Sequence, residues 1–154
     1  MPLHDVEPLE ATIEIDAPVA KVWSLVSDLR NMSRWSPQVR RTFFRGDIAV
    51  GTKTLNINRR GLLVWPTQSK VVRLTPEQEI AFRVKENYTV WSYRLEDLEG
   101  GRTRLTSRRE APQGISDVSV RLTKVALGGV PQFTSELQQD MHTTLTKIKA
   151  DAER

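Results

Sequence analysis

The chain has 154 residues, of which 38% are hydrophobic and 27% charged, and its net charge of +4 accompanies an isoelectric point near 9.7. These values suit one globular domain over residues 1–154 with an irregular tail at 1–8. The absence of cysteine excludes a disulfide framework, a thiol nucleophile and a thiolate metal site. The first residues, MPLHDVEPLE, lack the basic start and apolar core of a signal peptide, and no run is as long as a membrane span, so we expect a cytoplasmic protein.

A strand followed by two helices opens the chain. Apolar residues alternate with polar ones over residues 9–16, which is the period of a half-buried strand. After Pro18, which suits the first turn of a helix, apolar residues recur on one helical face over 19–26. Residues 28–37 favour caps and turns and predict a second, short helix that ends near Trp35.

Residues 38–110 predict six short strands joined as an antiparallel meander. Turn-forming pairs such as Gly46-Asp47 and Thr75-Pro76 separate the segments, and Gly61 and Pro66 mark another connection. The clearest strands alternate apolar and polar residues, which gives the sheet one apolar face and one solvated face.

A long amphipathic helix is predicted at the end of the chain. Apolar residues recur every three or four positions across 131–154, and a helix of about twenty residues is roughly 30 Å long. Because its apolar stripe needs a partner, we expect an α+β fold in which a curved antiparallel sheet wraps around this helix. Just before it, residues 116–127 are amphipathic and end at Gly128-Gly129, so they could form a lid on a hinge or the first part of a kinked helix.

The order of these elements, together with IEIDAPVAKVW at 13–23 and DLRNMSRWSP at 28–37, resembles the START-like (SRPBCC) superfamily and, within it, the bacterial polyketide cyclase/dehydrase-like members. The resemblance covers residues 9–148. It implies the helix-grip fold and, commonly, a ligand cavity between the sheet and the long helix. The superfamily contains carriers, cyclases, hydrolase-like enzymes and accessory proteins, so the fold alone does not choose the function.

The strand alternation predicts which side chains would line such a cavity. They are Leu55, Ile57, Phe82, Trp91, Tyr93, Leu105 and Ser107 from the sheet, and Phe133, Leu137 and Met141 from the terminal helix. By the resemblance Trp35 lies near the cavity mouth, where it could act as a rim or gate; the alternative is a local cap on the short helix. Apolar residues at these spacings also pack as ordinary core, and the sequence leaves both interpretations open.

Catalytic machinery is sparse. No G-x-S-x-G, H-E-x-x-H or phosphate-binding glycine loop is present, no metal or cofactor is indicated, and His142 has no evident partner. Continued alternation turns Arg109 inward together with Glu86, and an inward arginine could stabilise an enolate or bind a carboxylate. Tyr93 could orient a ligand through its hydroxyl. The alternative for Arg109 is a structural arginine–glutamate pair at a strand end or a side chain that reaches solvent.

We expect the protein to bind an apolar or amphipathic small molecule, such as a lipid or a polyketide-like compound, in this cavity. A second interpretation is a polyketide cyclase or dehydratase assisted by Tyr93 or Arg109. A third is a nonenzymatic module that meets a membrane or an acidic protein through a basic outer sheet face, where Arg102, Arg104 and Arg108 share one parity. No aromatic residues are interleaved with these arginines, so no specific nucleic acid partner is predicted, and the oligomeric state stays open.

Overall fold

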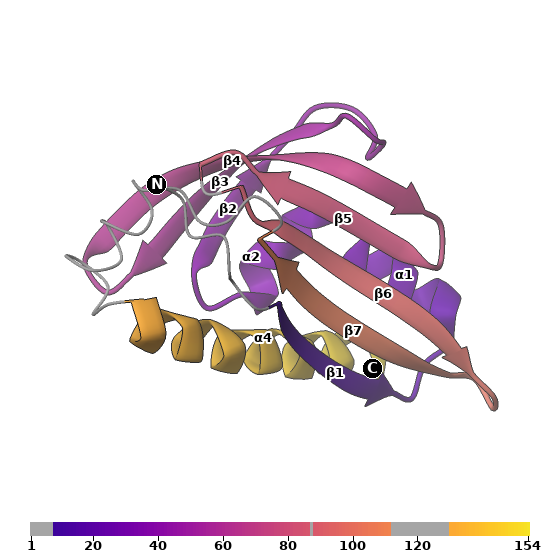
Figure 1. The fold of residues 1–154 in the computed structure, drawn as a ribbon. Helices are drawn as coiled ribbons and strands as arrows, with labels where there is room; N and C mark the ends of the chain where they lie inside the picture. Colours follow the sequence, from indigo (N-terminus) through magenta and orange to yellow (C-terminus); the bar gives the residue numbers. More distant parts are fainter. Residues whose placement is uncertain (1–7, 87, 112–129) are drawn as a thin grey trace.

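The computed structural model describes residues 8–86, 88–111 and 130–154, and in the last segment the side chains from residue 135 onward. Within these residues it contains seven strands, three short helices and one long helix (Figure 1). Their bounds are β1 (Leu9–Ile15), α1 (Val19–Val26), the 3-10 helix η1 (Leu29–Asn31), α2 (Met32–Trp35), β2 (Val39–Phe43), β3 (Lys53–Arg60), β4 (Leu63–Thr75), β5 (Glu79–Val84), β6 (Val90–Leu98), β7 (Arg102–Glu110) and α4 (Val130–Ala152).

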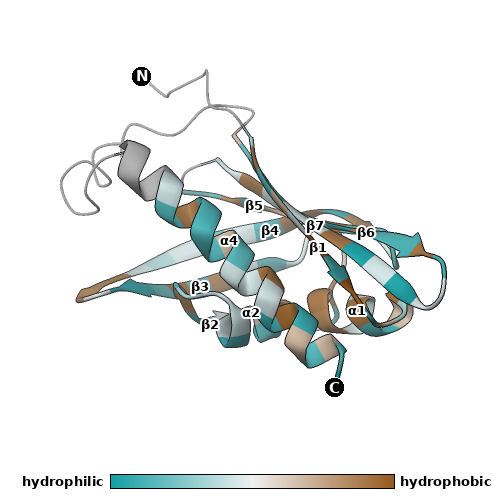
Figure 2. Ribbon diagram, turned by 90° about the horizontal axis from the view of Figure 1, so that it is seen from below, coloured by the Kyte–Doolittle hydropathy of each residue, from teal (hydrophilic) through white to brown (hydrophobic). Residues whose placement is uncertain are grey.

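The strands form one antiparallel sheet in the order β1-β7-β6-β5-β4-β3-β2, so β1 and β2 are its edges. From β2 to β7 each strand pairs with the next along the chain, as the turn-rich sequence predicts. Register shifts between Val39 and Arg41 and between Val71 and Arg73 interrupt two ladders, and bulges of this kind bend strands and increase their twist. The sheet curls and α4 lies across its open side (Figures 1 and 2), which confirms the expected α+β arrangement.

The hairpin between β3 and β4 differs from the prediction at Pro66. Gly61 and Leu62 alone form the turn between the paired residues Arg60 and Leu63. Gly61 has a φ of 61°, a value that glycine adopts without steric cost and that a two-residue hairpin requires. Pro66 lies inside β4, opposite Ile57 on β3, so its predicted place in the turn is wrong.

The C-terminal half of α4 and helix α1 form the main hydrophobic core with the sheet. Leu145 and Ile148 of α4 and Val22 of α1 are fully buried there. Figure 2 shows this end of α4 beside α1, with the other end of the helix extending past β3 and β4. Leu105 of β7 belongs to this core and has no exposed surface, so it packs against protein and not against a cavity.

Trp35 joins the short helix α2 to the end of α4. Its side chain is 2% exposed, and its indole Nε1 donates a hydrogen bond of 2.7 Å to Oδ2 of Asp151. Arg34 contacts the same carboxylate at 2.8 Å, and the Thr144 hydroxyl donates to the Trp35 carbonyl at 3.5 Å. The predicted rim or gate role of Trp35 is wrong, because the indole N–H is satisfied inside the protein and the ring is enclosed.

Three predictions concern parts of the chain outside the described residues. These are the tail before residue 8, the amphipathic segment 116–127 with its two glycines, and the side chain of Phe133. Of the helices that the structure does describe, none combines the length and the hydropathy needed to cross a membrane.

Candidate functional site

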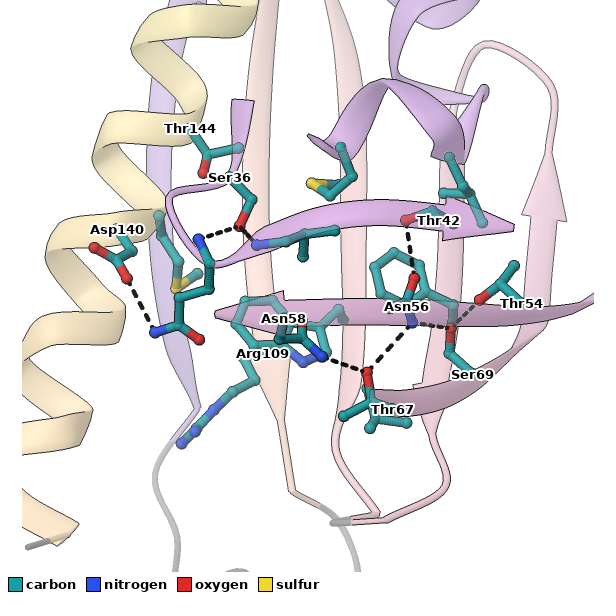
Figure 3. A pocket seen from close by; sticks show the side chains of 18 of the residues that line it. Ser36, Thr42, Thr54, Asn56, Asn58, Thr67, Ser69, Arg109, Asp140 and Thr144 are labelled. Atoms are coloured by element: carbon teal, nitrogen blue, oxygen red, sulfur yellow. Dashed lines mark hydrogen bonds between the residues drawn. The ribbon is translucent and has the colours of Figure 1, made fainter. Parts of the chain in front are cut away.

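An open cavity of about 210 Å³ lies between α2, the N-terminal half of α4 and the concave side of strands β2 to β7 (Figure 3). It is smaller than the roughly 300–1,000 Å³ of pockets that enclose drug-sized ligands. Its walls differ in chemistry. Strands β2, β3 and β4 present mainly hydroxyl and amide groups, together with Val39 and Trp65, whereas β5, β6, η1, α2 and α4 contribute mainly aliphatic, aromatic and thioether side chains.

The polar wall is a ladder of six side chains that hydrogen-bond to one another across three strands. Its members are Thr42 on β2, Thr54, Asn56 and Asn58 on β3, and Thr67 and Ser69 on β4. The Thr42 hydroxyl donates to Oδ1 of Asn56 at 3.0 Å, and Nδ2 of Asn56 donates to the Ser69 hydroxyl at 3.2 Å. Nδ2 of Asn58 donates to the Thr67 hydroxyl at 3.0 Å, and the hydroxyls of Thr54 and Ser69 also bond (Figure 3). These bonds hold the ladder in place, while hydroxyl and amide oxygens retain lone pairs for a ligand.

The apolar wall continues from this ladder along the sheet, where Ser69 of β4 pairs with Val84 of β5, and α4 completes it. Phe82 of β5 lies opposite Trp91 of β6 in the sheet register, and both line the cavity with Leu137 and Met141 of α4. These side chains offer a surface on which the apolar part of a ligand can be buried.

Tyr93 gives the apolar wall one hydroxyl donor. It is 5% exposed, pairs with Ser107 across β6 and β7, and donates a weak hydrogen bond of 3.5 Å to the sulfur of Met32. Burial raises the pKa of Tyr93 well above its usual value, and a hydrogen bond with Ser107 offsets only part of this shift. The phenol therefore stays protonated and can donate to a ligand oxygen, but it cannot act as a base at neutral pH.

Arg109, near the end of β7, is the cation inside the cavity. It is 5% exposed and lines the cavity, as the alternation of β7 predicts. Its Nε has no hydrogen-bond partner, and its guanidinium forms no ion pair with any residue that the structure describes. Burial lowers the pKa of Arg109, because the charged form loses its hydration. The predicted alternative of an Arg109–Glu86 pair is wrong, since Glu86 is exposed and accepts the backbone N–H of Gln68 at 2.5 Å.

Asp140 lines the cavity from the long helix α4. Its Oδ2 accepts a hydrogen bond of 3.2 Å from Nε2 of Gln38 (Figure 3). Burial raises the pKa of Asp140 above its usual value, although the Gln38 bond works in the opposite direction. On the next turn of α4, Glu136 forms a two-pronged ion pair with Arg60 of β3, at 2.8 and 2.5 Å, which ties the hairpin to the helix.

Two predicted cavity residues point the other way. Leu55 is 40% exposed on the convex face of the sheet, and Ile57 shares its parity on β3, so their predicted inward direction is wrong. The segment KTLNINRR alternates as expected, but the polar phase, Thr54 and Asn56, faces the cavity. The reason is that this part of the sheet borders an open cavity, where hydroxyls and amides can hydrogen-bond, and not the packed core.

Besides Arg109, the structure brings six of the predicted ligand-binding residues together around the cavity. They are Phe82, Trp91, Tyr93, Ser107, Leu137 and Met141. Sequence reasoning missed the polar ladder and Asp140. The alternation of Thr and Asn in β3 was a signal for the ladder, because three polar residues at spacing two on one strand indicate a hydrophilic face that the fold could enclose.

The outer arginines of β7 are paired with carboxylates. Arg102 contacts Glu14 at 2.7 Å, Arg104 contacts Glu96 at 2.9 Å, and Arg108 contacts a glutamate of β1 at 3.2 Å. The charge of these three arginines is therefore largely compensated by neighbouring glutamates. His142, the other titratable residue considered earlier, is exposed on α4. Across the described parts of the chain, no group of three or more potential ligand side chains could hold a metal ion.

A curled antiparallel sheet that holds a long C-terminal helix over an internal cavity defines a helix-grip domain. The chain belongs to the family described as "Polyketide cyclase / dehydrase and lipid transport", which it matches over residues 8–153. No curated protein sequence matches the chain.

Solved structures with the same fold include aromatase/cyclases. The Zhui aromatase/cyclase from Streptomyces sp. R1128 is similar with a TM-score of 0.73 and 15% identity, over 96% of this chain and 94% of that one. The di-domain aromatase/cyclase StfQ from the steffimycin biosynthetic pathway gives a TM-score of 0.74 at 15% identity, over 95% of this chain and 50% of that one. A Polyketide_cyc-like protein from Corynebacterium glutamicum is 23% identical, with a TM-score of 0.59, over 96% of this chain and 89% of that one. At these identities the likeness establishes the fold and not a shared substrate.

Proposed function

We propose that the protein binds an amphipathic small molecule, of the polyketide or lipid kind, in the cavity beneath α4. The observation that carries this proposal is the division of the cavity into an apolar wall and a polar ladder that the fold keeps inside. A molecule with an apolar body and several oxygens satisfies both walls at once. Family membership and the aromatase/cyclase structures support the same class of ligand.

The two walls contribute to ligand binding in different ways. Burial of apolar ligand surface against Phe82, Trp91 and Leu137 supplies affinity at roughly 25 cal/mol per Å². The ladder fixes the ligand's orientation, because a ligand that covers Asn58, whose amide only donates within the ladder, must supply a donor for the amide oxygen or leave it unpaired, at about 1–3 kcal/mol.

A cyclase activity is the second candidate, and the raised pKa of Asp140 favours it. A carboxylate with a raised pKa is a stronger base, so Asp140 could remove a proton from a carbon next to a ligand carbonyl. The resulting enolate carbon would attack a second carbonyl of the same ligand, and the new alkoxide would take up a proton. Tyr93 can donate a hydrogen bond to the oxygen on which charge develops.

Ligand binding is tested with the neutral fluorophore N-phenyl-1-naphthylamine, whose emission rises in apolar sites. We expect saturable binding to the full chain, weakened by about tenfold or more in Leu137→Ala and Trp91→Ala. Leu55→Ala is the matched control, because Leu55 lies on the convex face. Equal affinity in all four proteins would show that the dye does not occupy the cavity and would refute the proposal.

Native mass spectrometry of the freshly purified protein then identifies any molecule that copurifies. To separate a carrier from a cyclase, that molecule or its linear precursor is incubated with the wild type and with Asp140→Asn. A cyclase converts the precursor and loses rate in the variant much more than affinity, whereas a carrier returns the molecule unchanged.

A further inference from the structure

Arg109 is a buried cation that the described protein does not compensate. Every other arginine discussed above has a carboxylate: Arg60 pairs with Glu136, and Arg108, the adjacent residue on β7, contacts Glu10 and Glu110 at 3.2 Å each. Arg109, at 5% exposure, has no such partner among the described residues, and its Nε is buried without a hydrogen bond. The Nε of Arg108 also lacks a hydrogen bond, but it lies 3.2 Å from a carboxylate oxygen of Glu110, so its charge is compensated. An unpaired buried charge lowers the stability of a fold, so its position facing a cavity indicates that a ligand provides the missing charge.

We propose that the ligand of this cavity carries a carboxylate, and that the guanidinium of Arg109 binds it. This inference rests on the proposed function, since it concerns the same cavity, and it narrows the ligand class from amphipathic molecules to amphipathic carboxylic acids.

Charge and geometry favour a carboxylate over other anions. A planar guanidinium matches the two oxygens of a carboxylate with two parallel hydrogen bonds. One cation compensates one negative charge, whereas a phosphate monoester carries roughly −1.5 to −2. The second charge of a phosphate would remain uncompensated in a cavity that Asp140 also lines.

The strand register places an aromatic surface directly beside this cation. Phe82, Trp91 and Arg109 form one row across β5, β6 and β7, because Phe82 is opposite Trp91 and Trp91 is opposite Arg109. All three line the cavity. Figure 3 shows Arg109 on the side of the cavity where Asn58 lies and away from Thr54 and Ser69, so the acid group of a ligand would lie at one end and the rest of the polar ladder farther along. A flat apolar body can therefore rest on the two aromatic rings while its carboxylate reaches the guanidinium.

The inference is tested with three probes that share one ring system. These are 2-naphthoate, the neutral 2-naphthamide and 2-naphthyl phosphate, each titrated into the full chain by calorimetry and in competition with N-phenyl-1-naphthylamine. We expect 2-naphthoate to bind roughly ten- to a hundredfold more tightly than 2-naphthamide, because that is the gain in affinity from one charge-assisted hydrogen-bonded pair between a carboxylate and a guanidinium. It should also bind more tightly than 2-naphthyl phosphate. Arg109→Met should reduce the naphthoate-to-naphthamide ratio to near one, while Arg108→Met, the same change on the outer face of the same strand, should keep the wild-type ratio.

The outcomes separate the two proposals. If the dye binds but naphthoate shows no preference over naphthamide, or the preference survives Arg109→Met, the carboxylate inference is wrong and the proposed function stands. Stronger binding of 2-naphthyl phosphate overturns the choice of carboxylate. If neither the dye nor any probe binds, both proposals fail.

A stability measurement tests the same idea without any ligand. Because Arg109 lacks a described partner, Arg109→Met should leave the unfolding midpoint unchanged or raise it, whereas loss of a structural ion pair would lower it. Saturating 2-naphthoate should raise the midpoint of the wild type but not of the variant. Should Arg109→Met fail to fold, that result contradicts the inference, and Arg109→Lys provides the second check: the lysine keeps the charge but loses the two-pronged geometry, so the preference for naphthoate should fall severalfold and not persist unchanged.

Discussion

The hydrogen bond between Trp35 and Asp151 should be a main attachment of α4 to the rest of the protein. Replacing Asp151 by alanine leaves the indole N–H of a 2% exposed side chain without its acceptor at 2.7 Å. Hydrogen bonds to charged groups contribute about 1.5–3 kcal/mol, so we expect Asp151→Ala to lower the free energy of unfolding by roughly 2 kcal/mol. For a chain of this length that is a fall in the unfolding midpoint of about 4–8 °C.

Arg34→Met is the matched control for this measurement. It removes the 2.8 Å contact of a 52% exposed arginine with the same carboxylate but leaves the indole bond intact. Exposed ion pairs contribute about 0–1 kcal/mol, so this change should cost far less. Both variants are compared with the wild type by urea unfolding, followed by tryptophan fluorescence and circular dichroism. If Asp151→Ala costs no more than Arg34→Met, then packing holds α4 in place and the buried bond does not.

Three further changes test the cavity and its surroundings. Asn56→Ala should lower the free energy of unfolding by about 1–3 kcal/mol in urea unfolding, because Thr42 and Ser69 lose a partner inside the ladder; an unchanged value would mean that water replaces the amide. Leu55→Ser should change the free energy of unfolding by less than about 0.5 kcal/mol, since Leu55 is 40% exposed. A decrease of about 2 kcal/mol or more would indicate that Leu55 is buried, as the sequence predicted. Asp140→Asn should stabilise the protein at neutral pH. The folded-state pKa of Asp140 is raised above the unfolded value of about 3.9, so in the wild type its contribution to stability is present at low pH and is lost as pH rises through the folded pKa. Asparagine does not titrate and avoids this loss. Urea unfolding of both proteins between pH 4 and 7 should show the variant's advantage growing with pH, and a constant difference would argue against this shift.

The fold followed from periodicity because its signals are local. The alternation over residues 9–16, the apolar face over 19–26 and the long stripe after residue 131 each report which side of an element is buried, and β1, α1 and α4 lie where these patterns predict. Turn chemistry located the connections except at Pro66, where the hairpin needs only Gly61 and Leu62.

The cavity was harder to predict because alternation gives two faces without saying which one is enclosed. In β3 the assumption that Leu55 and Ile57 point inward reversed the assignment, since this cavity wall is polar. Arg109 was placed correctly by parity, but its lack of a described partner depends on Glu86 turning outward, a contact between strands that no single segment encodes. Trp35 likewise looked solvated among polar neighbours, because its acceptor, Asp151, comes from the far end of the chain.

The ladder on β2, β3 and β4 also bears on the thermodynamics of ligand entry. A recess lined by hydroxyls and amides is hydrated before a ligand arrives, because such groups hold water with several hydrogen bonds. An incoming molecule must then displace ordered solvent, and it gains affinity only where its own oxygens take over those bonds. Among ligands of equal hydrophobicity, differences in affinity would therefore come mainly from the enthalpy of these hydrogen bonds, and the spacing of oxygen atoms along the molecule would decide which ligand binds best.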